Sequence, residues 1–229
     1  MRAAVVTVGD ELLSGDTVNT NATWLCRELT DRGVEVERVA VVPDDTDEIA
    51  EIIGSFHERY DVVLVTGGLG PTHDDRTMEG VAAAFEREIE RHPGAFAWLT
   101  EEGGYAAGDL TAGTAELPTD ARFLPNEVGV APGAVVENVY VFPGVPAEMK
   151  AMFEQVATEF VGERRYTRVV HAAEPESELL DRIAGALEEF DVVIGSYPGD
   201  GVDIKITATE ESEAEAAAAW LRERVDSDS

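Results

Sequence analysis

The chain has 229 residues, 47 of them acidic and 17 basic, which gives a formal net charge of -30 at pH 7. Nucleic acids and anionic membranes bind to basic patches, so this composition excludes both as partners. The acids are spread along the whole chain instead of forming a tail that could bind a basic partner. They indicate adaptation to a salt-rich cytoplasm, as in extreme halophiles.

Cys26 is the only cysteine, so an internal disulfide is impossible. It falls on the apolar side of a predicted helix, a position more typical of a core residue than of a nucleophile. No stretch approaches the length of a membrane span, and the N-terminus leads into a strand without a signal peptide. We therefore expect a cytoplasmic protein.

Strand and helix patterns alternate along the first part of the chain, as is typical of a parallel sheet with right-handed crossovers. Asp45, with Glu48 three residues later, resembles a capping box at a helix start, and Gly33 is a plausible helix end. Residues 103–119 are predicted to be a loose segment. The predicted strands are 3–8, 34–42, 62–65, 134–137 and 139–142, and the predicted helices are 20–32, 45–59, 76–87, 94–102 and 146–161.

The composition changes at residues 162–165, where we place a boundary between a domain of residues 1–162 and a small module of residues 163–229. Asp200 and Gly201 form a hairpin turn signal within the module. The fold class we predict is a three-layer α/β/α domain with a mostly parallel sheet, followed by a two-layer α/β module. The module's predicted strands are 166–172, 192–197 and 202–209, and its predicted helices are 177–190 and 214–225.

The segment after the third strand carries the strongest functional signal. The buried run 62–65 leads into Gly67, Gly68 and Gly70, and the paired acids Asp74 and Asp75 follow. Glycine-rich backbone can close its N–H groups around an anion, and paired carboxylates suit the divalent cation that accompanies a phosphate. The alternative is an ordinary glycine-rich turn with solvated acids at a helix N-terminus.

Two further segments are expected to meet this loop, because ligands of parallel sheets collect at the carboxyl ends of the strands. Asp10 and Glu11 directly follow the first strand, and adjacent acids cost energy unless a cation neutralises them. Asn19 and Asn21 either cap the next helix or face the ligand. The helix that begins at Pro146 would direct free N–H groups into the same cleft.

Other catalytic patterns are missing from the sequence. His73 lies beside the acid pair and is either a solvated loop residue or a ligand or base. The remaining histidines are scattered, without the spacing of a zinc site. There is no nucleophile elbow, Walker lysine or kinase motif, and residues 67–70 do not match a dinucleotide fingerprint.

Several of these segments resemble the molybdopterin-binding (MoCF biosynthesis) domain, and within it the N-terminal domain of CinA proteins of a haloarchaeal type. The similarity covers nearly the whole chain, because residues 176–179 and 196–198 resemble the small module that follows this domain in CinA proteins. The matching stretches of the first domain are VGDELLSG (8–15), VNTNA (18–22), TGGLGPT (66–72) with Asp74 and Asp75, LPNEVGVAPG (124–133) and PGVPAEM (143–149).

The resemblance implies a small-molecule ligand, either a nucleotide or a pterin phosphate, and an association into dimers or trimers. It implies a divalent metal of the Mg²⁺ or Co²⁺ class on Asp74 and Asp75, with molybdopterin as a second possible cofactor. Catalysis is assigned to Asp75, Asp10 and Glu11. The ligand-binding residues it implies are Gly67, Gly68, Gly70, Thr72, Ser14, Asn19, Asn21, Pro143, Gly144 and Glu148.

Three functions stay open. The CinA resemblance implies a metal-dependent hydrolase of a nucleotide pyrophosphate such as ADP-ribose or FAD. However, residues 9–11 read Gly-Asp-Glu, as in the molybdate-inserting branch, where CinA proteins usually have Gly-Thr-Glu; residues 111–115 also lack the family's polar pattern. Molybdenum cofactor assembly is therefore the rival enzyme function. A nucleotide- or pterin-binding module without chemistry is the third, although paired acids hinder pure anion binding.

Overall fold

The computed structural model describes residues 1–70, 72, 75–106 and 113–226. The chain divides into two compact units, Met1–Gly162 and Glu163–Ser229, and each has hydrophobic clusters of its own. Within the described ranges, no helix combines the length and the apolar character needed to cross a bilayer.

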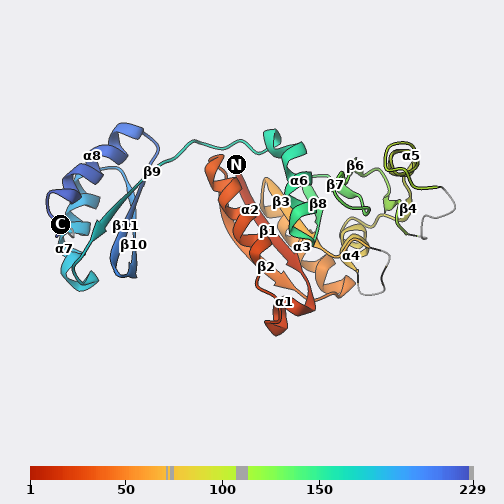
Figure 1. Ribbon diagram of the computed structural model, residues 1–229, viewed down its shortest axis with the longest axis horizontal. Helices are drawn as coiled ribbons and strands as arrows, with labels where there is room; N and C mark the ends of the chain where they lie inside the picture. Colours follow the sequence, from red (N-terminus) through yellow and green to blue (C-terminus); the bar gives the residue numbers. More distant parts are fainter. Residues whose placement is uncertain (71, 73–74, 107–112, 227–229) are drawn as a thin grey trace. The chain divides into compact units, whose positions relative to one another are not determined.

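A six-stranded sheet forms the centre of the first unit, in the order β2-β1-β3-β8-β7-β6 (Figure 1). Strands β2, β1, β3 and β8 run parallel, whereas β7 pairs antiparallel with both β8 and β6. The predicted mostly parallel sheet is confirmed. The strands are β1 (Arg2–Val8), β2 (Glu35–Val42), β3 (Val62–Gly67), β6 (Arg122–Leu124), β7 (Gly133–Val136) and β8 (Val139–Pro143).

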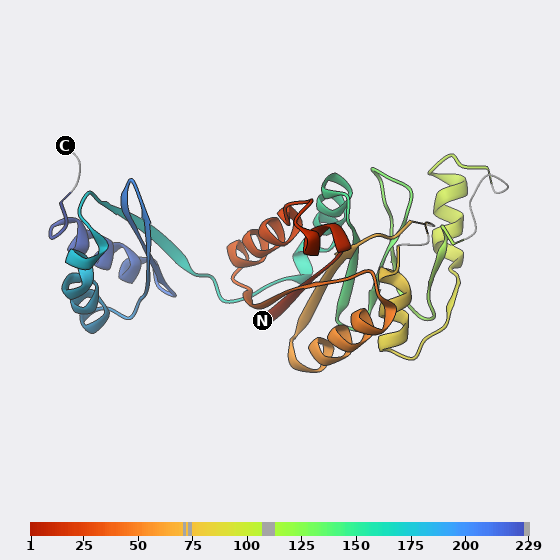
Figure 2. The same cartoon turned by 90° about the horizontal axis from the view of Figure 1, so that it is seen from below.

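Helices cover both faces of this sheet, which gives the three layers (Figure 2). One face packs against α3, α4 and α5, and the other against α2 and α6. β3 is buried along its whole length, as its unbroken apolar run requires, because a central strand meets a helix layer on each side. The helices are α1 (Asp10–Ser14), α2 (Thr20–Asp31), α3 (Thr46–Arg59), α4 (Thr77–Ala84), α5 (Pro93–Glu101) and α6 (Pro146–Val156), with a 3₁₀ turn at Ala157–Glu159.

The predicted helix caps are confirmed. Asn19 Oδ1 accepts a hydrogen bond of 3.1 Å from the N–H of Ala22, which satisfies a free donor in the first turn of α2. Asp45 Oδ1 caps α3 in the same way. It accepts hydrogen bonds of 3.0 and 3.1 Å from the N–H groups two and three residues later. Gly33 follows α2 with φ of 76°, the left-handed conformation expected just beyond a helix end.

Four short elements are not among the predicted helices and strands. They are α1, β6, and the antiparallel pair β4 (Ile89–Arg91) and β5 (Glu116–Pro118). β5 lies inside the segment 103–119 that was predicted to be loose. Each of these strands has only three residues, and its pairing comes from distant parts of the chain, so local sequence carries little signal for it.

The second unit is a two-layer module. Its antiparallel sheet has the order β10-β11-β9, and the turn between β10 and β11 uses Gly201 with φ of 87°. Alternate residues of β11 are buried in the module's core, beginning with Val202 and Ile204. Its elements are β9 (Tyr166–Ala172), α7 (Glu176–Glu189), β10 (Val193–Gly199), β11 (Gly201–Ala208) and α8 (Glu211–Arg222).

A buried carboxylate fastens the end of the described chain to this module, and it should make the module sensitive to acid. Glu174, only 7% exposed, accepts hydrogen bonds from Arg182 and from the N–H of Asp226. The hydrogen bond from Arg182, with that from the backbone, holds the pKa of Glu174 below its ordinary value. A lowered pKa means that the folded state favours the ionised form, so this stabilisation is complete above the unfolded pKa and disappears as the pH falls through the folded one.

We therefore expect Glu174→Gln to lower the module's unfolding temperature by several degrees at pH 7. The difference from the unsubstituted protein should shrink as the pH falls below the ordinary glutamate range. Calorimetry across that pH range measures it, and Glu189→Gln, at an exposed carboxylate at the end of α7, is the control. A difference that is the same at all pH values would contradict this account.

Candidate functional site

The carboxyl ends of β1, β3 and β8 open into a cavity of about 690 Å³ in the first unit. This volume is typical of small-molecule sites. Much of the lining is glycine or other backbone, with acidic side chains among it. The lining residues are Val8, Gly9, Glu11, Asp44, Gly67, Gly68, Leu69, Gly70, Asp75, Thr114, Gly129, Val130, Ala131, Pro143, Gly144, Val145 and Glu148.

The Asp75 carboxylate lies directly against the glycine loop. A Cβ atom added to Gly68 would overlap Asp75 Oδ1, and one added to Gly70 would lie 2.7 Å from Oδ2. The Thr72 hydroxyl donates a hydrogen bond to Asp75 Oδ2, and the Asp75 N–H donates to the Thr72 carbonyl at 3.0 Å. Glycine is therefore required at position 68 for Asp75 to take this place.

The ends of β3 and β8 approach each other closely beside the loop. Gly67 pairs with Pro143, and a Cβ atom on Gly144 would lie 3.3 Å from the carbonyl carbon of Gly67. The Thr66 hydroxyl donates to the Pro143 carbonyl at 2.7 Å and fixes the two strand ends together. At this point the cavity floor consists of backbone atoms.

Asn21 connects α2 to this floor. Its Nδ2 donates to Gly144 O at 2.7 Å and to Thr66 Oγ1 at 3.2 Å, while its Oδ1 is buried without a partner in the described part of the chain. Asn19, besides capping α2, donates to Thr7 Oγ1 at 2.8 Å. Both asparagines line a smaller pocket of about 100 Å³, which shares Glu11 and Gly144 with the main cavity.

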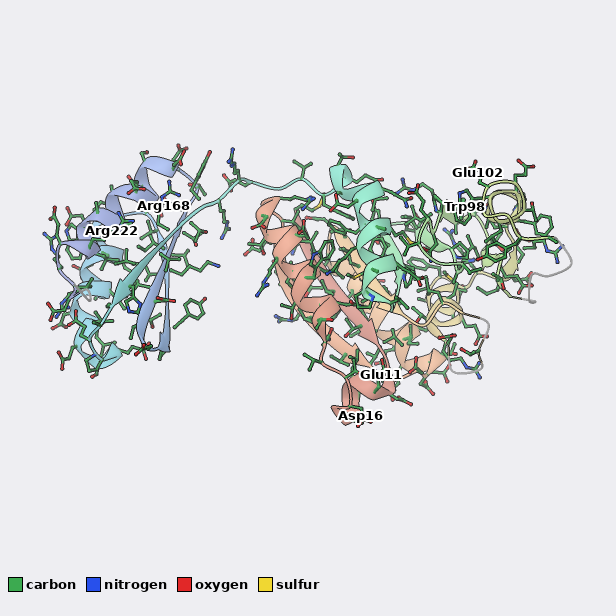
Figure 3. All side chains as sticks on the ribbon, in the orientation of Figure 1. Glu11, Asp16, Trp98, Glu102, Arg168 and Arg222 are labelled. Carbon is green, nitrogen blue, oxygen red and sulfur yellow. The ribbon has the colours of Figure 1, made fainter. Side chains whose placement is uncertain are left out.

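The two predicted site acids that follow β1 lie in different surroundings. Glu11 lines the cavity, and its Oε1 lies 2.5 Å from where a Cβ of Gly9 would be (Figure 3). Asp10 is exposed and absent from the lining, and its N–H donates to Asp44 Oδ2 at 3.0 Å. Both start the short helix α1, where successive side chains are about 100° apart, so only one of them can face the cavity.

Ser14 and Thr72 also lie apart from the main lining. Ser14 is exposed at the end of α1, where its hydroxyl donates to Asp16 Oδ2 at 2.8 Å. Thr72 lines an adjoining pocket of about 330 Å³ together with Gly70 and Asp75. The structure thus brings together Glu11, Asp75, the glycines, Pro143, Gly144 and Glu148 from the predicted set. Asp74 and His73 fall outside the described residues.

Two functional residues were missed by the sequence analysis. Asn126 is 1% exposed, and its Nδ2 donates to Glu148 Oε2 at 2.7 Å and to the Ala131 carbonyl at 2.9 Å. Its Oδ1 accepts from the N–H groups of Val128 and Gly129, so one side chain fixes both the loop and the acid. The available signal was an amide residue in a Gly- and Pro-rich connection between two strands.

Asp44 is the second missed residue, and it lines the cavity. It follows β2 closely, so it carries the same signal, an acid just after a parallel strand, that drew attention to Asp10 and Glu11. Its carboxylate accepts the hydrogen bond from the Asp10 N–H. Four acids, Glu11, Asp44, Asp75 and Glu148, therefore share one cavity.

Among the described residues that line the cavity, the side-chain donors available to a metal are all oxygens, which suits a hard divalent cation. Among the residues that the structure describes, no three acids, histidines or cysteines lie together closely enough to hold an ion by themselves. Mg²⁺ commonly uses one or two protein carboxylates and takes its other ligands from water and from substrate phosphates. Asp75, beside the glycine loop and lining the cavity, fits that mode.

The family profile described as "Probable molybdopterin binding domain" matches residues 4–163. A protein of Archaeoglobus fulgidus is 36% identical over 225 residues, which cover 97% of each chain. The chain belongs to the molybdopterin-binding domain family.

Within that family the chain is of the CinA type. A solved structure of the protein CinA, of unknown function, from Thermoplasma acidophilum is 40% identical, with a TM-score of 0.64; the match covers 70% of this chain and 98% of that one. A CinA-like protein of Frankia casuarinae is 46% identical over 165 residues, which cover 67% of this chain and 38% of that protein.

Proposed function

We propose that the cavity binds the diphosphate of a nucleotide and hydrolyses it with the help of a divalent cation, on a substrate of the ADP-ribose or FAD class. The observation that carries this proposal is the bare backbone of Gly67, Gly68, Gly70 and Gly144 lining one cavity with four carboxylates. Backbone N–H groups suit the phosphate oxygens, and carboxylates suit a cation and a water molecule. This is also the activity that the CinA resemblance implies.

Hydrolysis needs water to attack one phosphorus while the bridging P–O bond breaks. The products are two phosphate monoesters and a proton that a base must accept. A bound cation would offset the developing charge, and Asp75 is the described residue best placed to hold it. Asn126 donates a hydrogen bond to one oxygen of Glu148 and so fixes the orientation of this carboxylate. A fixed carboxylate suits the role of the base that accepts the proton. Of Asp10 and Glu11, which were both predicted to help, Glu11 lines the cavity and takes the supporting role.

Molybdenum cofactor assembly is the second candidate, because the matching family is described by molybdopterin binding. The same cavity would then hold a pterin phosphate. Association into dimers or trimers and a cytoplasmic location are compatible with either function, and both remain predictions.

A substrate panel tests the proposal. The protein is incubated in concentrated KCl with Mg²⁺ or Co²⁺ and with ADP-ribose, FAD or an adenylated pterin, and products are separated by chromatography. We expect metal-dependent cleavage of ADP-ribose or FAD, and Asp75→Asn should reduce it by about 10² to 10⁴. Glu51→Gln, an equal charge change at an exposed position of α3, should leave the rate unchanged.

The other outcomes separate the candidates. Turnover of the adenylated pterin alone would favour cofactor assembly. Tight binding of any of the three compounds without turnover would favour a binding module and would contradict the proposed hydrolysis.

A further inference from the structure

A pocket of about 440 Å³ adjoins the main cavity at Gly129, which lines both. It is formed by the C-terminal end of α5 and by the loop 126–129. Among the residues that the structure describes, none of those predicted to form the site lines it. The pocket is thus a separate set of side chains beside the main cavity.

Two aromatic side chains form one side of this pocket. Trp98 is half-buried, and its ring packs against Phe123 with centroids 6.2 Å apart. The Tyr105 N–H donates to Leu99 O at 3.1 Å, and a Cβ atom on Gly103 would lie 3.2 Å from the Tyr105 ring. The backbone at and just after the end of α5 thus brings both rings to this pocket, where they can pack against a flat ligand.

The charged side chains among the described residues of the pocket are both carboxylates. Glu102 lies one turn after Trp98 and projects beside it (Figure 3), and Glu127 lies on the opposite loop. An ionised carboxylate only accepts hydrogen bonds, so it favours a ligand edge that carries N–H donors and disfavours a carbonyl edge. The neighbouring Asn126 amide is already engaged with the loop and Glu148.

We infer that this pocket is a subsite for an amino-substituted heteroaromatic ring, stacked on Trp98 and Tyr105 and bound through its amino group by Glu102 or Glu127. The inference deepens the proposed function, since the ring would belong to the nucleotide whose diphosphate lies in the main cavity. Asn126 connects the two pockets, because it lines the second and orients Glu148 in the first.

Nucleosides without phosphate test the subsite separately from hydrolysis. Adenosine, purine riboside and inosine share a ring frame and carry an amino group, a hydrogen and a carbonyl at the same position. Calorimetric or NMR titration of the full chain should show adenosine binding about tenfold more tightly than purine riboside, with inosine weakest. Tyr105→Ser, at an exposed position, should weaken all three equally.

The double variant Glu102→Ala/Glu127→Ala should remove most of the preference for adenosine, whereas Glu101→Ala, at an exposed residue outside the pocket, should retain it. Equal binding of adenosine and purine riboside, or a preference that survives the double variant, overturns the inference. Amino-dependent binding without any pyrophosphate cleavage supports the subsite and counts against the hydrolase. Cleavage without a preference among the three nucleosides supports the hydrolase and counts against the subsite.

Discussion

Gly68→Ala is expected to reduce cleavage by about 100-fold or more while the chain stays folded. The added methyl group would occupy the place of Asp75 Oδ1, and the carboxylate would have to leave the glycine loop. A displacement of about 1 Å in a reacting or metal-binding group is enough for a loss of this size. Steady-state kinetics with the best substrate of the panel measures the effect, and circular dichroism checks the fold.

Gly54→Ala is the matched control, because Gly54 lies inside α3 and a Cβ there meets no atom within 4 Å. It should leave activity unchanged and stabilise the protein by about 0.5–1 kcal/mol, since alanine loses less backbone entropy in a helix. In an Asp75→Ala background, Gly68→Ala should cause little further loss of cleavage, because the carboxylate that it displaces is already absent. Full activity of Gly68→Ala would show that Asp75 does not act from its present position.

Asn126→Ala should impair both stability and catalysis. It removes a buried side chain that donates to Glu148 and to Ala131 and accepts from two loop N–H groups, which leaves those partners unsatisfied. We expect a loss of about 2–4 kcal/mol in the free energy of unfolding. The rate at saturating substrate should also fall, because Glu148 loses the group that orients it. Denaturant titration and kinetics measure the two effects.

The variant Asn138→Ala separates the loss of stability from the loss of catalysis. Asn138 lies in the turn before β8, at the end of the sheet away from the cavity, and its Nδ2 donates to the His57 and Tyr60 carbonyls at 3.1 and 2.8 Å. Its replacement should lower the free energy of unfolding by a similar amount without slowing cleavage by the folded protein. If both variants leave the rate per folded molecule intact, Asn126 has a structural role only.

Much of the first unit could be predicted from local patterns. The run 62–65 indicated a doubly covered strand, and the polar residues Asn19 and Asp45 marked helix starts through hydrogen bonds made within three residues. β4 and β5 could not be predicted in this way. They lie 25 residues apart in sequence, from Arg91 to Glu116, and contain too few residues to show a period.

The residues of the candidate site also divide into those that sequence patterns could predict and those that they could not. The glycine loop and Glu11 were expected to meet because the ends of parallel strands share one edge of the sheet, and the structure places them in one cavity. Asp10 was expected there as well, but it does not line the cavity, and its carboxylate accepts a hydrogen bond from the Asp44 N–H. Asn126 acts through contacts across 22 residues to Glu148, which no spacing rule identifies.

The close approach of Gly67 and Gly144 limits how this protein could acquire a new ligand. The main-chain N–H and C=O groups are the same for nearly every residue type. Substitutions therefore cannot change the polar groups that line the cavity at this point. Changes in selectivity have to come from the rim, at Glu11, Asp44 and Glu148 or at the aromatic end of α5. If the proposed function holds, relatives that keep the glycines but differ at these rim positions should bind the same phosphate group and differ in the rest of the ligand.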